Sequence, residues 1–339
     1  MDRIYVQTND AEHNEVVVFD RAPDGSIEPI GRFDTGGRGS GEPHLASQSS
    51  LALNDDSSLL LVTNAGSDQL SLFAVQDVGL QLERIADTGG RIPTSVAVHG
   101  TTAYVLNAGG EGGITGFSLA GRALEPIEGS TRPLSVAGAD PAQIAFSPDG
   151  RTLVVTERGT NSISAYTVDE RGVAEGPRTI ASSGATPYGF DFAEGAVVVT
   201  EAFGGAIGAA AASSYALREP GRLEPVSASV GDTRSEVCWA AVTKDGRFAY
   251  VTNFGDGTIS SYALRGDGSI ELLEPVAAST RLGEKGVRDE AITPDGRFLY
   301  ALDADARRVY GWSVGDDGSL TPVGHIDGLP ETVAGLAAS

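Results

Sequence analysis

The chain has 339 residues, of which 40% are hydrophobic, so it can bury a substantial core in one large domain or in two ordinary ones. Its formal net charge of -22 repels nucleic-acid phosphates and anionic membrane surfaces, which argues against both as partners. The single cysteine, Cys238, excludes an intramolecular disulfide, and no apolar run approaches the roughly 18 residues of a membrane helix. Residues 1–10 contain no basic segment followed by an apolar one, so we expect a cytoplasmic protein.

One short segment recurs along the whole chain, an apolar strand that ends in a polar residue. Its copies are IYVQTN, LLVTN, AYVLN, LVVTE, VVVTE, AYVTN and LYALD. Their last residues are Asn9, Asn64, Asn107, Glu157, Glu201, Asn253 and Asp303. The copies are separated by about 43 to 55 residues, which is the range of four-stranded propeller blades. Seven copies therefore predict seven blades.

Further strands and tight turns surround each copy. An alternating strand such as residues 162–168 follows it, and then a turn such as residues 265–269 leads into another short strand. SPDG at 147–150 and TPDG at 293–296 precede two copies; proline presets such turns and glycine supplies their positive φ. The segments before these turns, PHLASQSSLAL, PTSVAVHG, PAQIAFSPDG, PYGFDFAEG, EVCWAAVTKDG and VRDEAITPDG, are interpreted as innermost strands.

The first blade has no innermost strand of its own at the start of the chain. PETVAGLAA at the other end, residues 330–338, resembles PTSVAV at 93–98 and would lead directly into residues 3–9. We predict that it joins the first blade, because this closure pairs edges that would otherwise be exposed.

The predicted fold is therefore all-β, a seven-bladed β-propeller of four-stranded antiparallel blades in a single domain, residues 1–339. The expected blades are 330–338 plus 3–33, 43–87, 93–128, 140–181, 186–228, 235–276 and 286–326. A parallel βαβ arrangement would need helical crossovers, and no amphipathic segment of that length is visible. The Ala-rich run 205–215 is a weak exception, and we expect it to be an irregular third strand of the fifth blade.

The propeller predicts where a pocket would lie. In an antiparallel meander the start of the first strand and the end of the second lie on the same face, and the innermost strands surround the axis. Polar residues at these positions should converge on one mouth of the central channel. Besides the second-strand ends, they are His44, Gln143, Tyr188, Glu236, Arg288, Asp289 and Glu331.

The sequence gives little support for a metal site built from histidine or for catalysis by a serine or cysteine nucleophile. The four histidines fall in separate repeats and no zinc-binding spacing occurs, so we expect no histidine-built metal site. Calcium held by channel carboxylates and asparagine amides stays an open alternative. There is no GxSxG segment, and Cys238 lies in an apolar stretch beside Trp239, where a buried inert thiol is expected.

The stretches PDGRFLYALD, KDGRFAYVTNFGDGTISSY and SPDGRTLVVTERGTNSISAY resemble the lactonase family of seven-bladed propellers over essentially the whole chain. That family includes 6-phosphogluconolactonases and carboxy-muconate lactonizing enzymes. The same motifs occur in noncatalytic YVTN-type propellers, so they specify the fold more strongly than the activity.

The resemblance implies an active site at one channel mouth. Glu201 matches the family glutamate that ends the second strand of the fifth blade, and Arg288 matches an arginine from a later blade. Ala142 and Gln143 stand where the family histidine is expected, and Tyr188 stands where an arginine is expected. Glutamine cannot carry protons, whereas tyrosine can donate a hydrogen bond.

We therefore expect an enzyme that opens or closes a small polar carboxylated lactone or sugar-acid lactone without a redox cofactor. Glu201 would be the acid/base, His44 an alternative proton carrier and Arg288 the anion anchor. The remaining substrate-binding residues would be Gln143, Tyr188, Glu236 and Asp289.

Alternatives remain at each level. Glu201 could be a turn residue like its asparagine counterparts, and Arg288 could form an ion pair with Asp289, Glu290 or Glu284. The whole protein could be a noncatalytic propeller that binds a small ligand or a protein through the same face. A monomer is expected as the default, because a propeller closes on itself.

Overall fold

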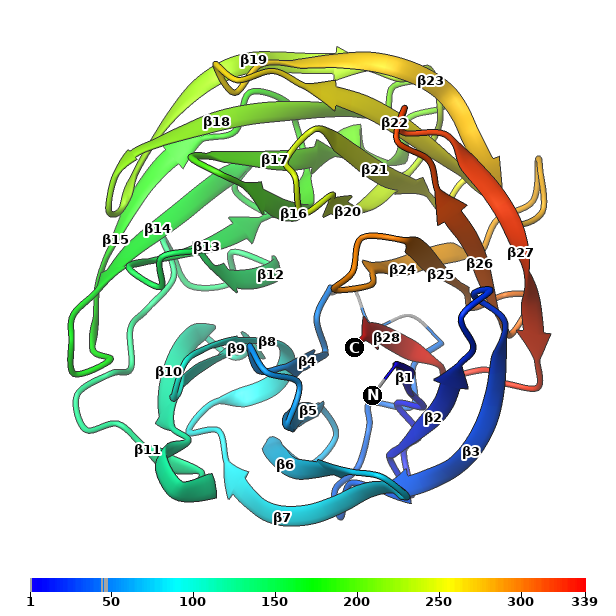
Figure 1. Ribbon diagram of the computed structural model, residues 1–339. Helices are drawn as coiled ribbons and strands as arrows, with labels where there is room; N and C mark the ends of the chain where they lie inside the picture. Colours follow the sequence, from blue (N-terminus) through cyan, green and yellow to red (C-terminus); the bar gives the residue numbers. More distant parts are fainter. Residues whose placement is uncertain (1, 44, 46–47) are drawn as a thin grey trace.

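The computed structural model describes residues 2–43, 45 and 48–339. Its described strands form seven four-stranded antiparallel sheets, arranged as blades in a ring around a central channel (Figure 1). The predicted seven-bladed propeller is thus confirmed. In each blade the innermost strand faces the channel and the fourth strand lies at the rim.

The first four blades follow the order of the chain, apart from the strand that closes the ring. Blade 1 contains β28 (Ala334–Ala338), β1 (Arg3–Gln7), β2 (Glu15–Arg21) and β3 (Ile27–Asp34). Blade 2 contains β4 (Leu51–Leu53), β5 (Leu59–Asn64), β6 (Gln69–Gln76) and β7 (Gly79–Asp87). Blade 3 contains β8 (Arg91–His99), β9 (Thr102–Gly109), β10 (Gly113–Ser118) and β11 (Glu125–Pro126). Blade 4 contains β12 (Pro141–Phe146), β13 (Thr152–Glu157), β14 (Ser162–Val168) and β15 (Ala174–Ala181).

The last three blades complete the ring. Blade 5 contains β16 (Pro187–Ala193), β17 (Ala196–Glu201), β18 (Ala211–Glu219) and β19 (Arg222–Gly231). Blade 6 contains β20 (Val237–Val242), β21 (Phe248–Asn253), β22 (Thr258–Leu264) and β23 (Ile270–Ser279). Blade 7 contains β24 (Val287–Ile292), β25 (Phe298–Asp303), β26 (Arg308–Val314) and β27 (Leu320–Asp327). The short 3₁₀ turns η1 (Ala120–Arg122) and η2 (Phe203–Gly205) interrupt blades 3 and 5.

The two chain ends meet beside the channel, as Figure 1 shows. β28 pairs antiparallel with β1, with Ala338 opposite Ile4 and Leu336 opposite Val6. The backbone N–H of Ser339 donates to the carbonyl of Arg3 at 2.8 Å and extends this pairing. The predicted closure by the C-terminal strand is confirmed, and it satisfies backbone groups that would otherwise form an open edge.

Tyrosines of the second strands in blades 3, 6 and 7 connect each of these blades to the next one. The hydroxyl groups donate to a glycine carbonyl in the turn between the third and fourth strands of the following blade. The pairs are Tyr104–Gly172 at 2.7 Å, Tyr250–Gly318 at 2.9 Å and Tyr300–Gly25 at 2.6 Å. All three glycines have positive φ, which a residue with a Cβ rarely adopts. The glycine turns between the third and fourth strands are therefore part of the interface between these blades.

The Ala-rich run 205–215 leads from η2 into β18, where Ala212 and Tyr215 are fully buried. Small side chains let this strand pack closely in the fifth blade, and a strand is formed there instead of a helix. Within the described residues, no helix is long and apolar enough to cross a membrane.

Candidate functional site

Glu201, at the end of β17, is fully buried and turned toward the outer part of its own blade. One carboxylate oxygen, Oε1, accepts from the N–H of Gly184 at 2.7 Å and from Ser213 Oγ at 2.5 Å. The other, Oε2, accepts from Ser229 Oγ at 2.6 Å. These donors come from β18, from β19 and from the loop before β16, and none of them belongs to an innermost strand.

The same arrangement recurs where other second strands end. In blades 2, 4 and 6 the terminal polar side chain bonds to a serine seven residues further on, in the third strand. The pairs are Asn64–Ser71 at 2.8 Å, Glu157–Ser164 at 2.7 Å and Asn253–Ser260 at 2.8 Å. These contacts agree with the alternative that Glu201 is a structural turn residue, since glutamate carboxylates and asparagine amides hydrogen-bond to a serine side chain at equivalent positions. Its acid/base role stays a prediction.

Three of the expected pocket residues do gather around Cys238. Tyr188, Glu236 and Arg288 lie at the mouth where the first strands begin, which we call the start mouth. The charges of Arg288, Glu236 and Arg158 all act on the Cys238 thiol, whose pKa burial raises to about 12. Cys238 is therefore a neutral thiol inside a ring of charged groups.

Arg288 is held firmly at the start mouth. Its guanidinium lies 4.8 Å from the centre of the Phe254 ring and donates to the carbonyl of Pro43 at 2.9 Å. Among the described residues its ion pair is with Asp305, at 3.6 Å, and not with the three acids that the sequence suggested. Burial lowers the pKa of Arg288, and the charge of Asp305 opposes this shift.

Arg158 is the residue of this mouth that sequence reasoning missed. It follows Glu157 directly, and its guanidinium lies 4.9 Å above the Tyr188 ring and donates to Tyr188 Oη at 3.0 Å. It also pairs with Asp140. Tyr188 stands where the family pattern has an arginine. Arg158 therefore supplies a cation beside this position. Its position directly after the end of a second strand could have identified it from the sequence.

Glu236 and Lys285 complete the start mouth. The ammonium of Lys285 contacts both carboxylate oxygens of Glu236, at 2.8 and 3.0 Å, and lies 5.6 Å from the Phe254 ring centre. The Glu236 side chain keeps 29% of its surface exposed, so solvent reaches this carboxylate. Glu331, also nominated from the sequence, is exposed in the loop before β28.

Side chains fill the channel below the start mouth. The Gln48 amide reaches from blade 2 to blade 6, where its Nε2 donates to the carbonyl of Ala240 at 2.8 Å and its Oε1 accepts from the same residue's N–H at 3.3 Å. Trp239 is buried and contacts the Tyr188 ring at 4.7 Å between centroids. A Cβ on Gly189 would lie 2.6 Å from the Cα of Trp239, so this position accepts only glycine.

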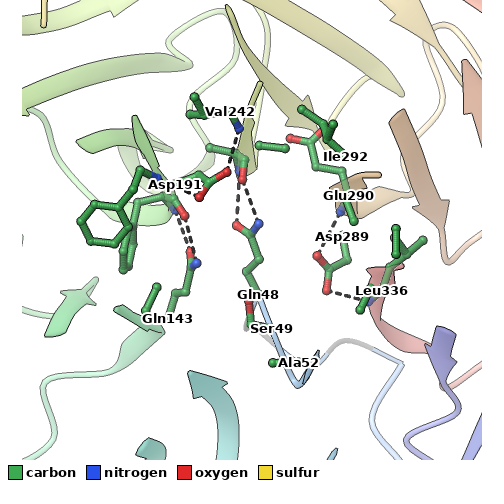
Figure 2. Close-up of a pocket in the computed structure, with 18 of the residues that line it drawn as sticks. Gln48, Ser49, Ala52, Gln143, Asp191, Val242, Asp289, Glu290, Ile292 and Leu336 are labelled. Carbon is green, nitrogen blue, oxygen red and sulfur yellow. Dashed lines mark hydrogen bonds between the residues drawn. The ribbon is translucent and has the colours of Figure 1, made fainter. Parts of the chain in front are cut away.

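A cavity of about 680 Å³ opens at the other end, where the first strands finish. We call this the end mouth. Gln143 and Asp289, both expected in the substrate pocket, line it together with Asp191 and Glu290 (Figure 2). Gln143 pairs with the backbone of Phe190, at 2.9 and 2.7 Å, so its amide joins blades 4 and 5. The expected residues are thus divided between two mouths, because successive positions along a first strand lie at different depths.

Backbone donors and burial set the chemistry of these acids. Asp191 accepts from the N–H of Val242 at 2.8 Å, and Asp289 accepts from the N–H of Leu336 at 3.1 Å. Burial nevertheless raises the pKa of Asp191 to about 6 and that of Asp289 to about 8. Burial, with the nearby charges of Asp289 and Asp191, also raises the pKa of Glu290 well above its usual value.

His44, the alternative proton carrier, lies outside the described residues. Across the described part of the chain, no group of three or more His, Cys, Asp or Glu side chains is arranged to hold a metal ion.

The fold and the start mouth define a seven-bladed propeller with a cluster of charged side chains at one end of its channel. The chain belongs to the lactonase family: the model of the family described as lactonase, 7-bladed beta-propeller, matches residues 111–202 and 198–332. No curated protein matches the chain.

Solved structures share the whole fold at low sequence identity. The periplasmic gluconolactonase of Pseudomonas aeruginosa superposes with a TM-score of 0.77 at 16% identity, covering 99% of this chain and 98% of that one. A candidate 6-phosphogluconolactonase of Bacteroides fragilis gives a TM-score of 0.74 at 16% identity, covering 100% and 98%. A functionally unknown protein of Desulfotomaculum acetoxidans gives 0.74 at 16%, covering 99% and 98%. At this identity the similarity establishes the fold.

Proposed function

We propose that this protein hydrolyses a small, negatively charged lactone at the start mouth, without a redox cofactor. The observation that carries the proposal is the pair of guanidinium groups, Arg158 and Arg288, that flank the Tyr188 hydroxyl. Both charges lower the pKa of Tyr188, although burial raises it more strongly. Family membership and the fold shared with a gluconolactonase support the substrate class.

The charged groups suggest a division of roles. Arg288 and Arg158 would hold the carboxylate or phosphate of the substrate, because guanidinium matches the geometry of such anions. Tyr188 would donate a hydrogen bond to the lactone carbonyl, and the neighbouring cations would stabilise the oxyanion that forms on it.

The base must accept a proton from the attacking water. Glu236 is the partly exposed carboxylate of this mouth and would take that proton, with His44 as the alternative carrier. The water oxygen bonds to the carbonyl carbon, the ring C–O bond breaks, and the proton passes to the departing ring oxygen. The product is the open hydroxy acid. In this proposal Glu201 takes no part in proton transfer. Its carboxylate holds the strands of blade 5 together.

The test is a pH-stat assay of lactone hydrolysis over a panel of sugar lactones, phosphorylated sugar lactones and muconolactones. We expect activity in the wild type, a raised KM in Arg158→Gln and Arg288→Gln, and a lowered kcat in Glu236→Gln. Arg247→Gln is the matched control, because Arg247 is an exposed arginine in the turn between β20 and β21. The proposal fails if no panel member is hydrolysed, or if Arg247→Gln lowers activity as much as the other two substitutions.

A noncatalytic binding propeller is the second candidate. It is favoured by the fully engaged carboxylate of Glu201 and by Gln143 at the place of the family histidine. Calorimetry with the same lactones distinguishes the two functions, because saturable heat without turnover indicates binding alone. A cytoplasmic location and a monomeric state remain predictions from the sequence, and light scattering after gel filtration tests the second.

A further inference from the structure

Glu290, in β24, is a buried acid for which the proposed reaction has no use. Its side chain is 2% exposed, lines the end-mouth cavity and extends from β24 toward β20 in Figure 2. Neither carboxylate oxygen has a hydrogen-bond partner within the described residues. Leaving such a group unpaired is costly, and most buried polar atoms in proteins are satisfied. The two oxygens therefore keep their capacity to accept hydrogen bonds, and each is buried at the cavity wall with almost no exposed surface.

The charge around Glu290 favours a positively charged donor. Asp191 and Asp289 are close enough for their charges to act on it, and none of the three acids forms an ion pair within the described part of the chain. Among the described residues that line the cavity, Lys244 alone is basic, and it is exposed in the turn after β20. Burial raises the pKa of Asp289 and Glu290, nearby charges add to the shift at Glu290, and a cation in the cavity would oppose both shifts by stabilising the ionised carboxylates.

The arrangement of the acids distinguishes an organic cation from a metal ion. Asp191 and Asp289 are each directed to the backbone of a neighbouring blade, through Val242 and Leu336. They do not converge with Glu290 on one point, and no metal-binding group of acids is found in the described residues. Much of the wall between them is apolar, with Ala52, Ala145, Ala240, Ala241 and Ile292. Such a wall suits a ligand with a charged head and a hydrocarbon body.

We propose that the end-mouth cavity binds a small organic ammonium ion, whose head donates hydrogen bonds to both oxygens of Glu290. The alkyl body lies on the alanine and isoleucine side chains, and the bound cation favours the ionised forms of Asp191 and Asp289. This site is separate from the start mouth, because none of the start-mouth residues Tyr188, Glu236 and Arg288 lines the cavity. The inference is therefore independent of the proposed lactone hydrolysis.

The test is isothermal titration of the full chain with 1,4-diaminobutane at physiological salt, with 1,4-butanediol as the neutral control of the same length. We expect saturable binding of one diamine per chain and no binding of the diol. In Glu290→Gln the affinity should fall about tenfold or more, because a charge-assisted hydrogen bond is lost. Glu194→Gln, a matched change at an exposed acid of the cavity rim, should leave the affinity unchanged.

Two further measurements keep the result interpretable. Thermal unfolding of each variant shows whether it is folded, and Ala52→Leu weakens binding by filling the cavity while every acid stays in place. Equal weakening in Glu194→Gln and Glu290→Gln would mean general attraction to an acidic protein and would overturn the proposal. Binding of calcium chloride, but not of the diamine, in a manner that depends on Glu290 would also overturn it in favour of an inorganic cation.

Discussion

The buried acid Asp289 makes the stability of the propeller depend on pH in an unusual direction. Its side chain is 2% exposed, and burial raises its pKa from the ordinary value of 3.8 to about 8. Between these values the folded protein holds a proton that the unfolded chain has released. The contribution is therefore fully present below about pH 4 and is lost as the pH rises through about 8.

The size of this effect follows from linkage. One proton that is held only by the folded state lowers the free energy of unfolding by about 1.4 kcal/mol for each unit of rising pH. Over the whole window the loss is on the order of 5 kcal/mol, since the pKa moves from 3.8 to about 8. Asp289→Asn removes this proton. It also gives up one good acceptor for the N–H of Leu336 or Glu290, at a cost of about 1 kcal/mol.

The two stability curves should therefore cross. We expect Asp289→Asn to be slightly less stable than the wild type at about pH 3.5, with the curves crossing between about pH 4 and 5, and more stable near pH 8.5. The assay is equilibrium unfolding in urea at several pH values, followed by tryptophan fluorescence, with refolding checked at each point. Asp317→Asn is the control, because Asp317 is an exposed turn acid whose pKa is lowered by hydrogen bonds from Ser319. Parallel pH profiles for the wild type and Asp289→Asn would refute the reasoning.

Three further predictions concern the start mouth and blade 5. Glu201→Gln should lower the free energy of unfolding by about 1–3 kcal/mol, because the carboxylate accepts several buried hydrogen bonds. The kcat should change little. A large loss of kcat in a variant of unchanged stability would instead support an acid/base role for Glu201. Gly189→Ala should destabilise by about 1–3 kcal/mol, since its Cβ would lie 2.6 Å from the Cα of Trp239; an unchanged urea midpoint would contradict the packing. Arg158→Lys should raise KM more than kcat falls, because an ammonium cannot lie flat on the Tyr188 ring; initial rates over substrate concentration separate the two, and unchanged kinetics would remove Arg158 from the site.

The exposed acids of the turns differ from those of the channel for a simple physical reason. Asp24, Asp267 and Asp317 accept hydrogen bonds from the serine two residues further on, which lowers their pKa. Asp191, Asp289 and Glu290 lie in the channel wall, where loss of hydration dominates and the pKa rises. The two groups of acids therefore make stability depend on pH in opposite directions: a lowered pKa favours the folded state as pH rises, and a raised pKa disfavours it.

The architecture could be predicted from the sequence because its signals are local and repeated. Each blade carries its own alternating strands and glycine turns, and seven copies of the segment from IYVQTN to LYALD determine the number of blades. Closure by residues 330–338 followed from the same repeat, since one inner strand was missing from the start and present at the end.

The site could be predicted only in part, because the repeat gives the position of a residue along a strand and not the contacts of its side chain. Tyr188, Glu236 and Arg288, selected by strand position, lie at one mouth, whereas Gln143 and Asp289 lie at the other. Arg158 and Glu290 were not selected, and their roles depend on blades packed beside them.

The sequence by itself thus determined a closed seven-bladed ring, because local periodicity and turn chemistry repeat in every blade. Only the tertiary structure decided that the Gln48 amide bonds to the backbone of Ala240, since these residues lie 192 positions apart and meet only when the ring closes. It also decided that Glu201 faces its own blade while Glu290 stays unpaired in a cavity, because burial and hydrogen-bond partners come from strands far apart in the chain.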